Sequence, residues 1–358
     1  MKELVNTLSD PKYSFTGVII GFYLFMKYYR TIGTVKFFIS SMIIILGVFI
    51  WMMQDPNFHA IIVWPDNVPI VILLFAVIFF TWFSIYKAAI NDARIEGGET
   101  PVEGSVENRE KVWTWPNLVY TELMAGTLCV VILVIWSIFL KAPLEEPANP
   151  TWAPNPAKAP WYFLGLQEML VYFDPWMAGV VLPGLIIVGL IAIPYIDTNP
   201  KGNGYYTMAE RKVAMGGFLF GWLALWVYLI IIGTFLRGPN WTFYGPFEVW
   251  DFHKVVAEAN VNLSEFFWIK GLGISMPSNI FLREIVGLIV TTGYYVGLTL
   301  LCNRSQLGSS LMKSLGKIRY YLLILLLLTM GLLPVKMYLR WLFNLKYLVA
   351  MPEFEFNL

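Results

Sequence analysis

Histidine is scarce in this sequence, which among 358 residues has only His59 and His253. A membrane protein that binds two haems through paired imidazoles needs histidines that face inward from its helices, two for each haem. Both histidines fall in segments between the long apolar runs, so the chain is not expected to ligate two haems by itself. We expect surface or hydrogen-bonding roles for both. The alternative is that His253 accepts a proton or contacts a redox partner.

Cysteine and net charge are also low. Cys129 and Cys302 have neither a CxxC nor a CxxCH context, so the sequence contains no motif for a redox dithiol or for covalently attached haem. Each lies within or at the end of an apolar run, and we expect both to be buried structural thiols. A net charge of +1 gives no reason to expect nucleic acid as a partner.

Apolar residues are abundant and make up 58% of the chain, against 14% charged residues. Together with a mean hydropathy of +0.63, this composition predicts an all-α polytopic membrane protein. Runs of roughly 20 apolar residues predict about eight transmembrane helices. They are expected over residues 13–29, 37–53, 68–86, 123–140, 177–196, 215–236, 285–301 and 321–338.

Lysine and arginine are unevenly distributed among the loops that join these runs. They cluster around the first turn, between the third and fourth runs, after the fifth run and after the seventh, whereas the loop 54–67 has none. Loops rich in lysine and arginine stay in the cytoplasm. We therefore expect both termini and the segment 160–168 on the outer face of the membrane.

Shifts in composition divide the chain into parts. Residues 91–116 mix glycine and proline with glutamate, and we expect a cytoplasmic linker there. It separates an accessory three-helix membrane unit, 1–90, from a core, 117–236. Residues 237–279 are polar but carry too many aromatic side chains for a disordered segment, so we expect an ordered aromatic lid on the outer face. Residues 280–358 add further membrane helices and a C-terminal tail.

The most informative segment is Lys-Ala-Pro-Trp-Tyr-Phe-Leu-Gly-Leu-Gln-Glu at 158–168, which lies between two membrane-length apolar runs but is too short to span. We expect it to form a short interfacial or re-entrant helix on the outer face. Pro160 suits the start of such a helix because its missing N–H is not needed there. The aromatic and aliphatic residues after Pro160 predict a pocket for an amphiphilic molecule.

This segment resembles the quinol-oxidation motif Pro-Glu-Trp-Tyr of the cytochrome b family, found in the carboxy-terminal half of cytochrome b and in subunit IV of cytochrome b6f complexes. The resemblance runs from about residue 116 to residue 236. It includes Trp-Pro-Asn at 115–117, a proline-rich loop at 141–156, Asp-Pro at 174–175 and Ile-Pro-Tyr-Ile-Asp at 193–197. The string Phe-Leu-Arg-Gly-Pro-Asn-Trp at 235–241 is similar to the segment after the next helix in bacterial members of the family.

The resemblance implies a haem-free membrane subunit of a bc-type quinol:cytochrome c, or quinol:electron-carrier, oxidoreductase in a bacterial energy-conserving membrane. Quinol would bind against Pro160, Trp161, Tyr162 and Phe163, with Tyr162 orienting it and Trp161 forming a wall of the pocket. Partners would carry haem b and an iron–sulfur cluster: a haem-carrying cytochrome b amino-terminal subunit, a Rieske iron–sulfur protein and c-type cytochrome subunits. Without the resemblance, the aromatic residues would be interpreted as an interfacial belt.

One position departs from the family motif. The motif glutamate is taken to accept a proton as quinol is oxidised, and the aligned residue here is Pro160, preceded by Ala159. A carboxylate in an apolar pocket is suited to this task because desolvation raises its pKa. We hypothesise that Glu168, about two helical turns further on, replaces the missing acid. The alternative is that Glu168 is exposed at the membrane interface or pairs with a cation of a partner chain.

Functions of other classes are also compatible with a polytopic helical chain. A quinone-binding membrane anchor of another respiratory complex would bind quinone without a haem b partner. A transporter would show internal symmetry and ionisable or unwound segments at mid-membrane in both halves, and the sequence shows neither. Loss of the motif glutamate is also compatible with a degenerate quinol site in a structural subunit.

Overall fold

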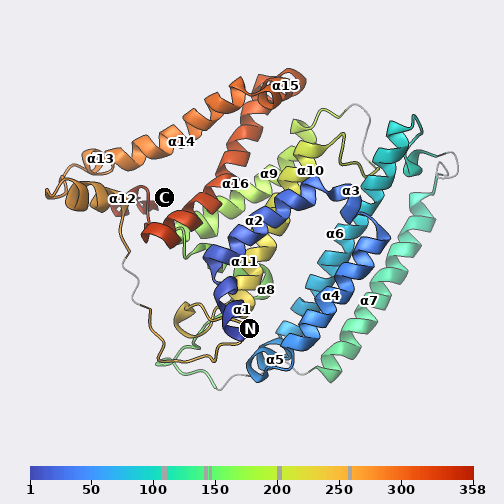
Figure 1. The fold of residues 1–358 in the computed structure, drawn as a ribbon, viewed down its shortest axis with the longest axis horizontal. Helices are drawn as coiled ribbons and strands as arrows, with labels where there is room; N and C mark the ends of the chain where they lie inside the picture. The colour runs from blue at the N-terminus through green and yellow to red at the C-terminus, as the bar shows by residue number, and fades with distance from the viewer. Residues whose placement is uncertain (106–110, 141–143, 145–146, 200–203, 257–259) are drawn as a thin grey trace.

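The computed structural model describes residues 1–105, 111–140, 144, 147–199, 204–256 and 260–358. Helices dominate this part of the chain (Figure 1), and its sheet structure is limited to one antiparallel pair, β1 (Ala350–Met351) with β2 (Phe356–Asn357). The predicted all-α fold is therefore confirmed.

The longer helices account for most of the apolar runs. They are α2 (Pro11–Lys27), α4 (Val35–Met52), α6 (Asn67–Glu96), α7 (Val119–Phe139), α9 (Leu182–Ile196), α14 (Ile285–Arg304) and α16 (Lys317–Phe343). A further continuous run consists of α10 (Lys212–Leu219), a π-helical segment η5 (Phe220–Val227), α11 (Tyr228–Ile231) and a second π-helical segment η6 (Ile232–Leu236). We call residues 212–236 the central helix.

Shorter helices connect these elements. They are α1 (Lys2–Ser9), α3 (Tyr29–Ile32), α5 (Pro56–Ile62), α8 (Trp161–Met169), α12 (Leu263–Glu265), α13 (Ile280–Arg283) and α15 (Gln306–Leu315). Further π-helical turns are η3 (Thr114–Leu118), η4 (Met177–Val181) and η8 (Phe266–Gly271), and the 3-10 turns are η1 (Val102–Gly104), η7 (Pro239–Trp241) and η9 (Pro352–Phe354).

Seven helical runs among the described residues are long and apolar enough to cross a membrane. They correspond to the predicted spans except the first. That span is α2, which ends at Lys27 after 17 residues because the backbone of Tyr28 leaves helical geometry, with φ −106° and ψ 24°. The polytopic membrane fold thus has seven helices of spanning length within the described ranges, where the sequence predicts about eight.

Polar residues at the helix starts explain where several of these helices begin. Asp10 accepts a hydrogen bond from the backbone N–H of Lys12 and is followed by Pro11, which has no N–H to leave unpaired. Asp55 caps α5 in the same way, and Ser305 accepts a hydrogen bond from the N–H of Gly308 at the start of α15. These caps satisfy backbone donors that a helix start otherwise leaves free.

The main hydrophobic core joins segments that are far apart in the sequence. Phe15 of α2 is fully buried, and its ring lies 5.1 Å from the ring of Tyr228, 5.9 Å from Tyr338 and 5.8 Å from Trp341. In Figure 1, α2 accordingly runs close to α11 and α16. The amino-terminal helix therefore packs within the same core as the central helix and α16.

The buried carboxylate of Asp92 links the end of α6 to the loop that precedes the central helix through hydrogen bonds. Asp92 accepts hydrogen bonds from the hydroxyl of Tyr29 at 2.9 Å, the hydroxyl of Thr207 at 2.5 Å and the backbone N–H groups of Met208 and Ala209. Asp92 is 1% exposed, so this anchor is shielded from water. It joins three segments: α3, α6 and the loop before α10.

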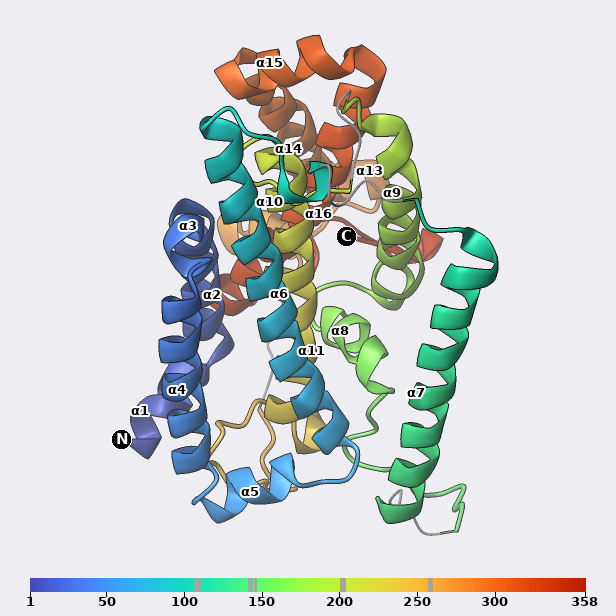
Figure 2. The same ribbon diagram turned by 90° about the vertical axis from the view of Figure 1, so that its right-hand side faces the viewer.

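Figure 2 shows that helix α7 stands apart from the other helices. None of its membrane window is buried within the chain, and residues such as Leu123, Met124 and Leu133 are at least 60% exposed. The expectation of a buried thiol is therefore wrong for Cys129, which is exposed on this helix. The sequence pattern could not distinguish a helix that faces neighbours from one that lacks them.

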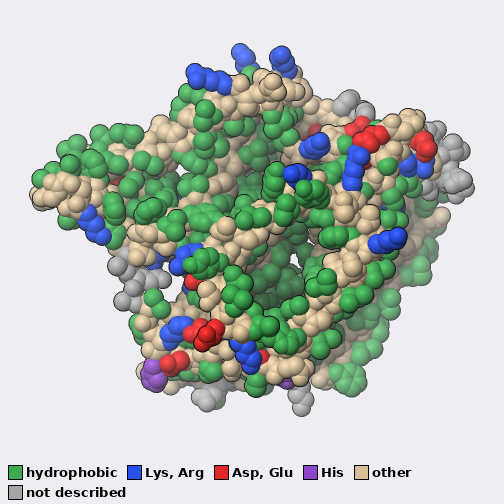
Figure 3. Space-filling view, in the orientation of Figure 1, with side chains coloured by type: hydrophobic (Ala, Val, Ile, Leu, Met, Phe, Trp, Pro, Cys, Tyr) green, Lys and Arg blue, Asp and Glu red, His purple; other side chains and the backbone are tan. Residues whose placement is uncertain are grey.

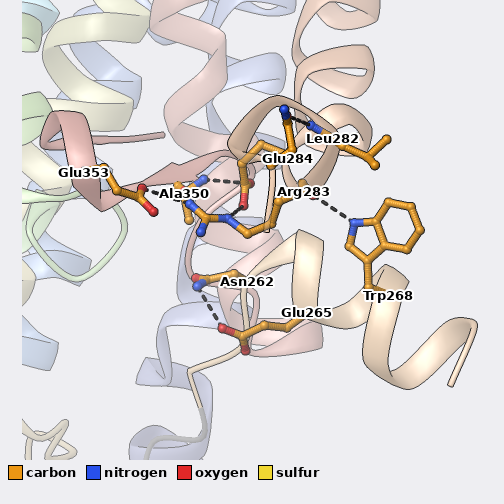
Figure 4. A network of polar contacts seen from close by, with 9 residues as sticks. Asn262, Glu265, Trp268, Leu282, Arg283, Glu284, Ala350 and Glu353 are labelled. Atoms are coloured by element: carbon orange, nitrogen blue, oxygen red, sulfur yellow. Dashed lines mark hydrogen bonds and ion pairs between the residues drawn. The ribbon is translucent and has the colours of Figure 1, made fainter. Parts of the chain in front are cut away.

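The C-terminal tail folds back against the start of α14. Glu284, which is 1% exposed, accepts a hydrogen bond from the N–H of Ala350 at 2.9 Å and pairs with Arg283 at 3.2 Å (Figure 4). Arg283 also pairs with Glu353 at 2.9 Å. A Cβ on Gly287 would overlap the carbonyl oxygen of Leu348, so α14 approaches the tail as closely as glycine permits.

Candidate functional site

The segment expected to form a short helix does so as α8, Trp161–Met169, directly after Pro160. Pro160 has φ −51° and ψ 146°, an extended geometry that suits the residue before a helix. One face of α8 is buried against the central helix. A Cβ on Gly233 of that helix would lie 3.2 Å from the carbonyl oxygen of Leu164, so the two backbones approach closely.

The opposite face of α8 presents the aromatic residues at the surface. Trp161, Tyr162 and Phe163 are 39%, 47% and 49% exposed, whereas Leu164 on the packed face is 3% exposed. The rings of Tyr162 and Phe163 lie 4.5 Å apart, and those of Trp161 and Tyr162 lie 5.7 Å apart. The three rings therefore form a continuous aromatic wall, the open side of which a ligand or another subunit can cover.

Glu168 lies on the buried face of α8 and forms a two-point ion pair with Arg237. The Arg237 Nη2 lies 2.6 Å from Glu168 Oε1, and the Arg237 Nε lies 2.9 Å from Glu168 Oε2. Both residues are buried, and Glu168 is 0% exposed. The interpretation of Glu168 as an exposed interfacial carboxylate is therefore wrong, and its cationic partner is in the same chain.

Two aromatic side chains complete the surroundings of Glu168. The indole N–H of Trp241 donates to Oε2 at 3.2 Å, and the hydroxyl of Tyr172 donates to Oε1 at 3.3 Å. Trp241 reaches this position because Asn240 and Trp241 adopt left-handed backbone conformations, with φ of 58° and 54°. Arg237 in turn donates to the Trp241 carbonyl at 2.9 Å. Each oxygen of this buried carboxylate thus accepts a hydrogen bond from Arg237 and another from an aromatic side chain.

Lys158 lies just before α8 and points toward the same end of the central helix. Its Nζ donates to the carbonyl of Thr234 at 2.7 Å and lies 5.0 Å from the centre of the Trp250 ring. The carbonyls at the end of a helix carry partial negative charge, which favours a cation there. Burial lowers the pKa of Lys158 to about 8, although the negative charge of Glu168 opposes this shift.

The segment that carries Lys158 is held by Gln167. The Gln167 Oε1 accepts a hydrogen bond from the N–H of Ala159 at 2.8 Å, and its Nε2 donates to the carbonyl of Ala157 at 2.8 Å. One side chain on α8 therefore fixes the backbone on both sides of Lys158. Next to this cluster, the hydroxyl of Thr234 and the indole N–H of Trp250 are buried without a hydrogen-bond partner among the described residues.

Groups that could bind a metal do not converge in the described part of the chain: it holds no cluster of three or more His, Cys, Asp or Glu side chains. His59 lies on α5 and His253 lies in the loop after the central helix, and both are exposed. Figure 3 places the histidines near the end of the molecule opposite α15.

Sequence reasoning placed Trp161, Tyr162, Phe163 and Glu168 on one short helix, as the structure does, but the structure puts the aromatic face and the carboxylate on different sides of it. Arg237 was not predicted as a site residue. The only signal was its place in the string 235–241, which resembles bacterial members of the family. Lys158 was likewise within the motif segment but had no predicted role.

Comparisons with known proteins point to the same segment. Residues 147–249 match the family model described as cytochrome b(C-terminal)/b6/petD. The match includes α8, the central helix and the Arg237–Trp241 turn, and it begins after α7. Two relatives are menaquinol:cytochrome c reductase cytochrome c subunits. That of Geobacillus thermodenitrificans is 32% identical over 120 residues, covering 32% of this chain and 46% of the relative.

The second, from Bacillus subtilis, is 30% identical over 112 residues, covering 29% of this chain and 42% of the relative. Cytochrome b of Acanthamoeba castellanii is 24% identical over 149 residues, covering 39% of this chain and 38% of the relative. The chain thus spans less than half the length of the curated relatives it matches. No solved structure gives a significant match. The matches to residues 147–249 thus support a cytochrome b carboxy-terminal, subunit IV-like protein.

Proposed function

We propose that this chain is the haem-free membrane subunit of a bc-type quinol:cytochrome c, or quinol:electron-carrier, oxidoreductase. In this proposal it forms the outer-face quinol-oxidation site together with a separate haem-b subunit and a Rieske iron–sulfur protein. The observation that carries the proposal is the two-sided character of α8. Trp161, Tyr162 and Phe163 are exposed side by side, while Leu164 and Glu168 fix the other face of the helix.

The aromatic wall supplies what a quinol ring needs on this side of the pocket. Trp161 and Phe163 offer flat apolar surfaces against which a ring can stack, and Tyr162 adds a hydroxyl that can orient the quinol oxygen. The wall is rigid because the buried face of α8 is packed against Gly233 and pinned through Glu168. A rigid wall lowers the entropic cost of ordering the bound quinol.

Proton transfer in this proposal involves Glu168, which takes the place of the motif glutamate. Both Glu168 oxygens already accept hydrogen bonds from Arg237. Because the carboxylate is fully buried on the side of α8 opposite the aromatic residues, and also accepts from Tyr172 and Trp241, it can take a proton only when this pair opens, for example by a shift of the Arg237–Trp241 turn. The pair would then hold α8 against the Arg237–Trp241 turn and also serve as the site of protonation.

Partner subunits supply the electron chemistry in this proposal. Quinol would lose its electrons one at a time, one to a Rieske-type cluster and one to haem b, and these centres belong to other chains. The exposed side of α7 offers an apolar surface for the haem-b subunit. The outer loop offers exposed Val249, Phe252 and Val255 beside His253, a surface on which a mobile redox domain could dock.

The direct test uses the complex purified through a tag on this chain. Quinol-dependent reduction of a c-type cytochrome should occur, and it should fall when Trp161 is changed to alanine. An anchor for another dehydrogenase would bind quinone but would not support this reaction without a separate dehydrogenase substrate. Crosslinkers placed at Trp250 or His253 should capture an iron–sulfur or c-type cytochrome subunit, and capture of neither would count against the docking surface.

A further inference from the structure

Helix α15 and the adjoining ends of α14 and α16 form a basic surface. It consists of Arg304, Lys313, Lys317 and Arg319, and we call these residues the α15 cation surface. No aspartate or glutamate occurs in the sequence between Glu284 and Glu353. In Figure 3 the basic side chains above α15 stand without acidic side chains beside them.

Four other cations at this end of the molecule are paired with acidic side chains of the same chain. The ion pairs there are Arg30 with Glu96, Arg94 with Glu99, Lys87 with Glu103, and Arg211 with Asp197. The residues of the α15 cation surface, by contrast, form no ion pair with any residue that the structure describes. Their charge is left for a partner outside the chain.

The position of α15 indicates what that partner is. The helix joins the ends of α14 and α16, both of which are long and apolar enough to cross a membrane. Exposed apolar side chains lie among the cations, since Leu307 is 62% exposed and Ile318 is 86% exposed. A short helix that combines cations with exposed apolar residues at the end of membrane spans has the character of an interfacial helix.

We propose that the α15 cation surface binds the phosphate groups of anionic phospholipids in the leaflet at this end of the molecule. Arginine can hold a phosphate through two parallel N–H groups, and lysine adds a mobile point charge. Leu307 and Ile318 enter the acyl-chain boundary of the same lipids. The cations extend over the ends of two helices. This spacing favours a lipid surface, which carries many phosphate groups, over a single small anion.

The test measures lipid retained by the purified full-length chain in its native assembly. The protein in detergent is incubated with equal amounts of phosphatidylglycerol or phosphatidylcholine, and bound lipid is counted by native mass spectrometry. The wild type should retain phosphatidylglycerol in preference to phosphatidylcholine. The variant Lys313→Gln/Lys317→Gln/Arg319→Gln should lose retention on the order of fivefold for each cation removed.

A matched control removes the same charge at the other ends of the helices, as Lys12→Gln/Lys270→Gln/Lys346→Gln, and should retain lipid as the wild type does. A charge-preserving variant, Lys313→Arg/Lys317→Arg/Arg319→Lys, should also bind normally and guards against a folding defect in the glutamine variant. Equal loss in the control, equal retention of both lipids, or full retention by the glutamine variant would overturn the proposal. Inorganic phosphate that competes as well as phosphatidylglycerol would show simple anion binding and would also overturn it.

Discussion

Glu168 and Arg237 are paired at two points inside the protein although they are separated by 69 positions in the sequence. The pair joins α8, which carries the aromatic motif, to the end of the central helix. Because Glu168 has no exposure and Arg237 is 7% exposed, neither charge has water to replace its partner. This relationship fixes the orientation of the proposed quinol wall.

Breaking this pair should destabilise the protein. The variant Glu168→Gln leaves a buried guanidinium without its counter-charge, and such losses cost about 3–5 kcal/mol. Arg237→Met should cost a similar amount, while the double variant should cost clearly less than the sum. Chemical unfolding of the purified complex measures these differences. Strictly additive losses would mean that the two residues do not stabilise each other.

The same Glu168→Gln variant also tests the proposed proton role. Quinol turnover should fall strongly at every pH, and the unfolding measurements show how much of that fall reflects lost protein. Glu168→Asp keeps the acid but shortens its reach, so it should retain part of the activity and shift its pH dependence. A Glu168→Gln complex with full turnover would remove Glu168 from the mechanism.

The aromatic wall should matter for turnover and not for stability. Trp161→Ala removes a side chain that is 39% exposed, so the free energy of unfolding should change little, while quinol turnover should drop on the order of tenfold. Trp152→Ala is a matched control because Trp152 is 59% exposed and lies outside the motif. Equal effects of the two variants on turnover would speak against a quinol wall at Trp161.

Lys158 should titrate close to neutral pH. Burial lowers its pKa to about 8, whereas an unfolded lysine has the ordinary value of 10.5. Between these values the unfolded chain binds more protons, so stability rises with pH across this window, and below about pH 8 the cost of the buried charge is present in full. The wild type should therefore gain stability relative to Lys158→Met from pH 8 to 10.5.

Chemical labelling tests the same group independently of stability. The rate at which acetic anhydride modifies Lys158, read by peptide mass spectrometry against Lys12 as an internal reference, should reach half its maximum near pH 8. A midpoint near 10.5 would show that Lys158 is solvated like a surface lysine.

A glycine on α14 should be needed for the tail to dock. Gly287→Ala would place a Cβ in overlap with the carbonyl oxygen of Leu348, which forces the helix and the tail apart. We expect a loss of about 1–3 kcal/mol or more. Gly293→Ala lies on the same helix with nothing within 4 Å of its Cβ, so it should be neutral or slightly stabilising. Thermal unfolding of both variants provides the comparison.

Local sequence patterns predict local features of this protein well. The apolar runs predict the long helices, and Pro160 followed by aromatic residues predicts α8 because helix starts and periodic faces depend on near neighbours. The pairing of Glu168 with Arg237 could not be deduced in this way, because the two residues are 69 positions apart and meet only when α8 packs against the central helix. The same limit applies to Phe15, whose neighbours in the core include Tyr338.

Exposure within a membrane chain is equally hard to deduce from composition. Cys129 lies in a run as apolar as the central helix, yet none of the α7 membrane window is buried among the described residues, whereas the central helix is largely buried. Hydropathy measures compatibility with a membrane and does not report which helices contact one another. The length of α2 also depended on a local break at Tyr28 that the apolar pattern does not reveal.

The most direct test of the proposed function is a dithionite-reduced minus oxidised optical spectrum of the complex isolated in mild detergent through a tag on this chain. We expect a b-type haem signal, contributed by a separate haem-bearing cytochrome b subunit, because the chain's own His59 and His253 are exposed and outside the long helices. An intact multisubunit preparation without b-haem absorbance would contradict the assignment to a bc-type complex and would favour the anchor or transporter functions.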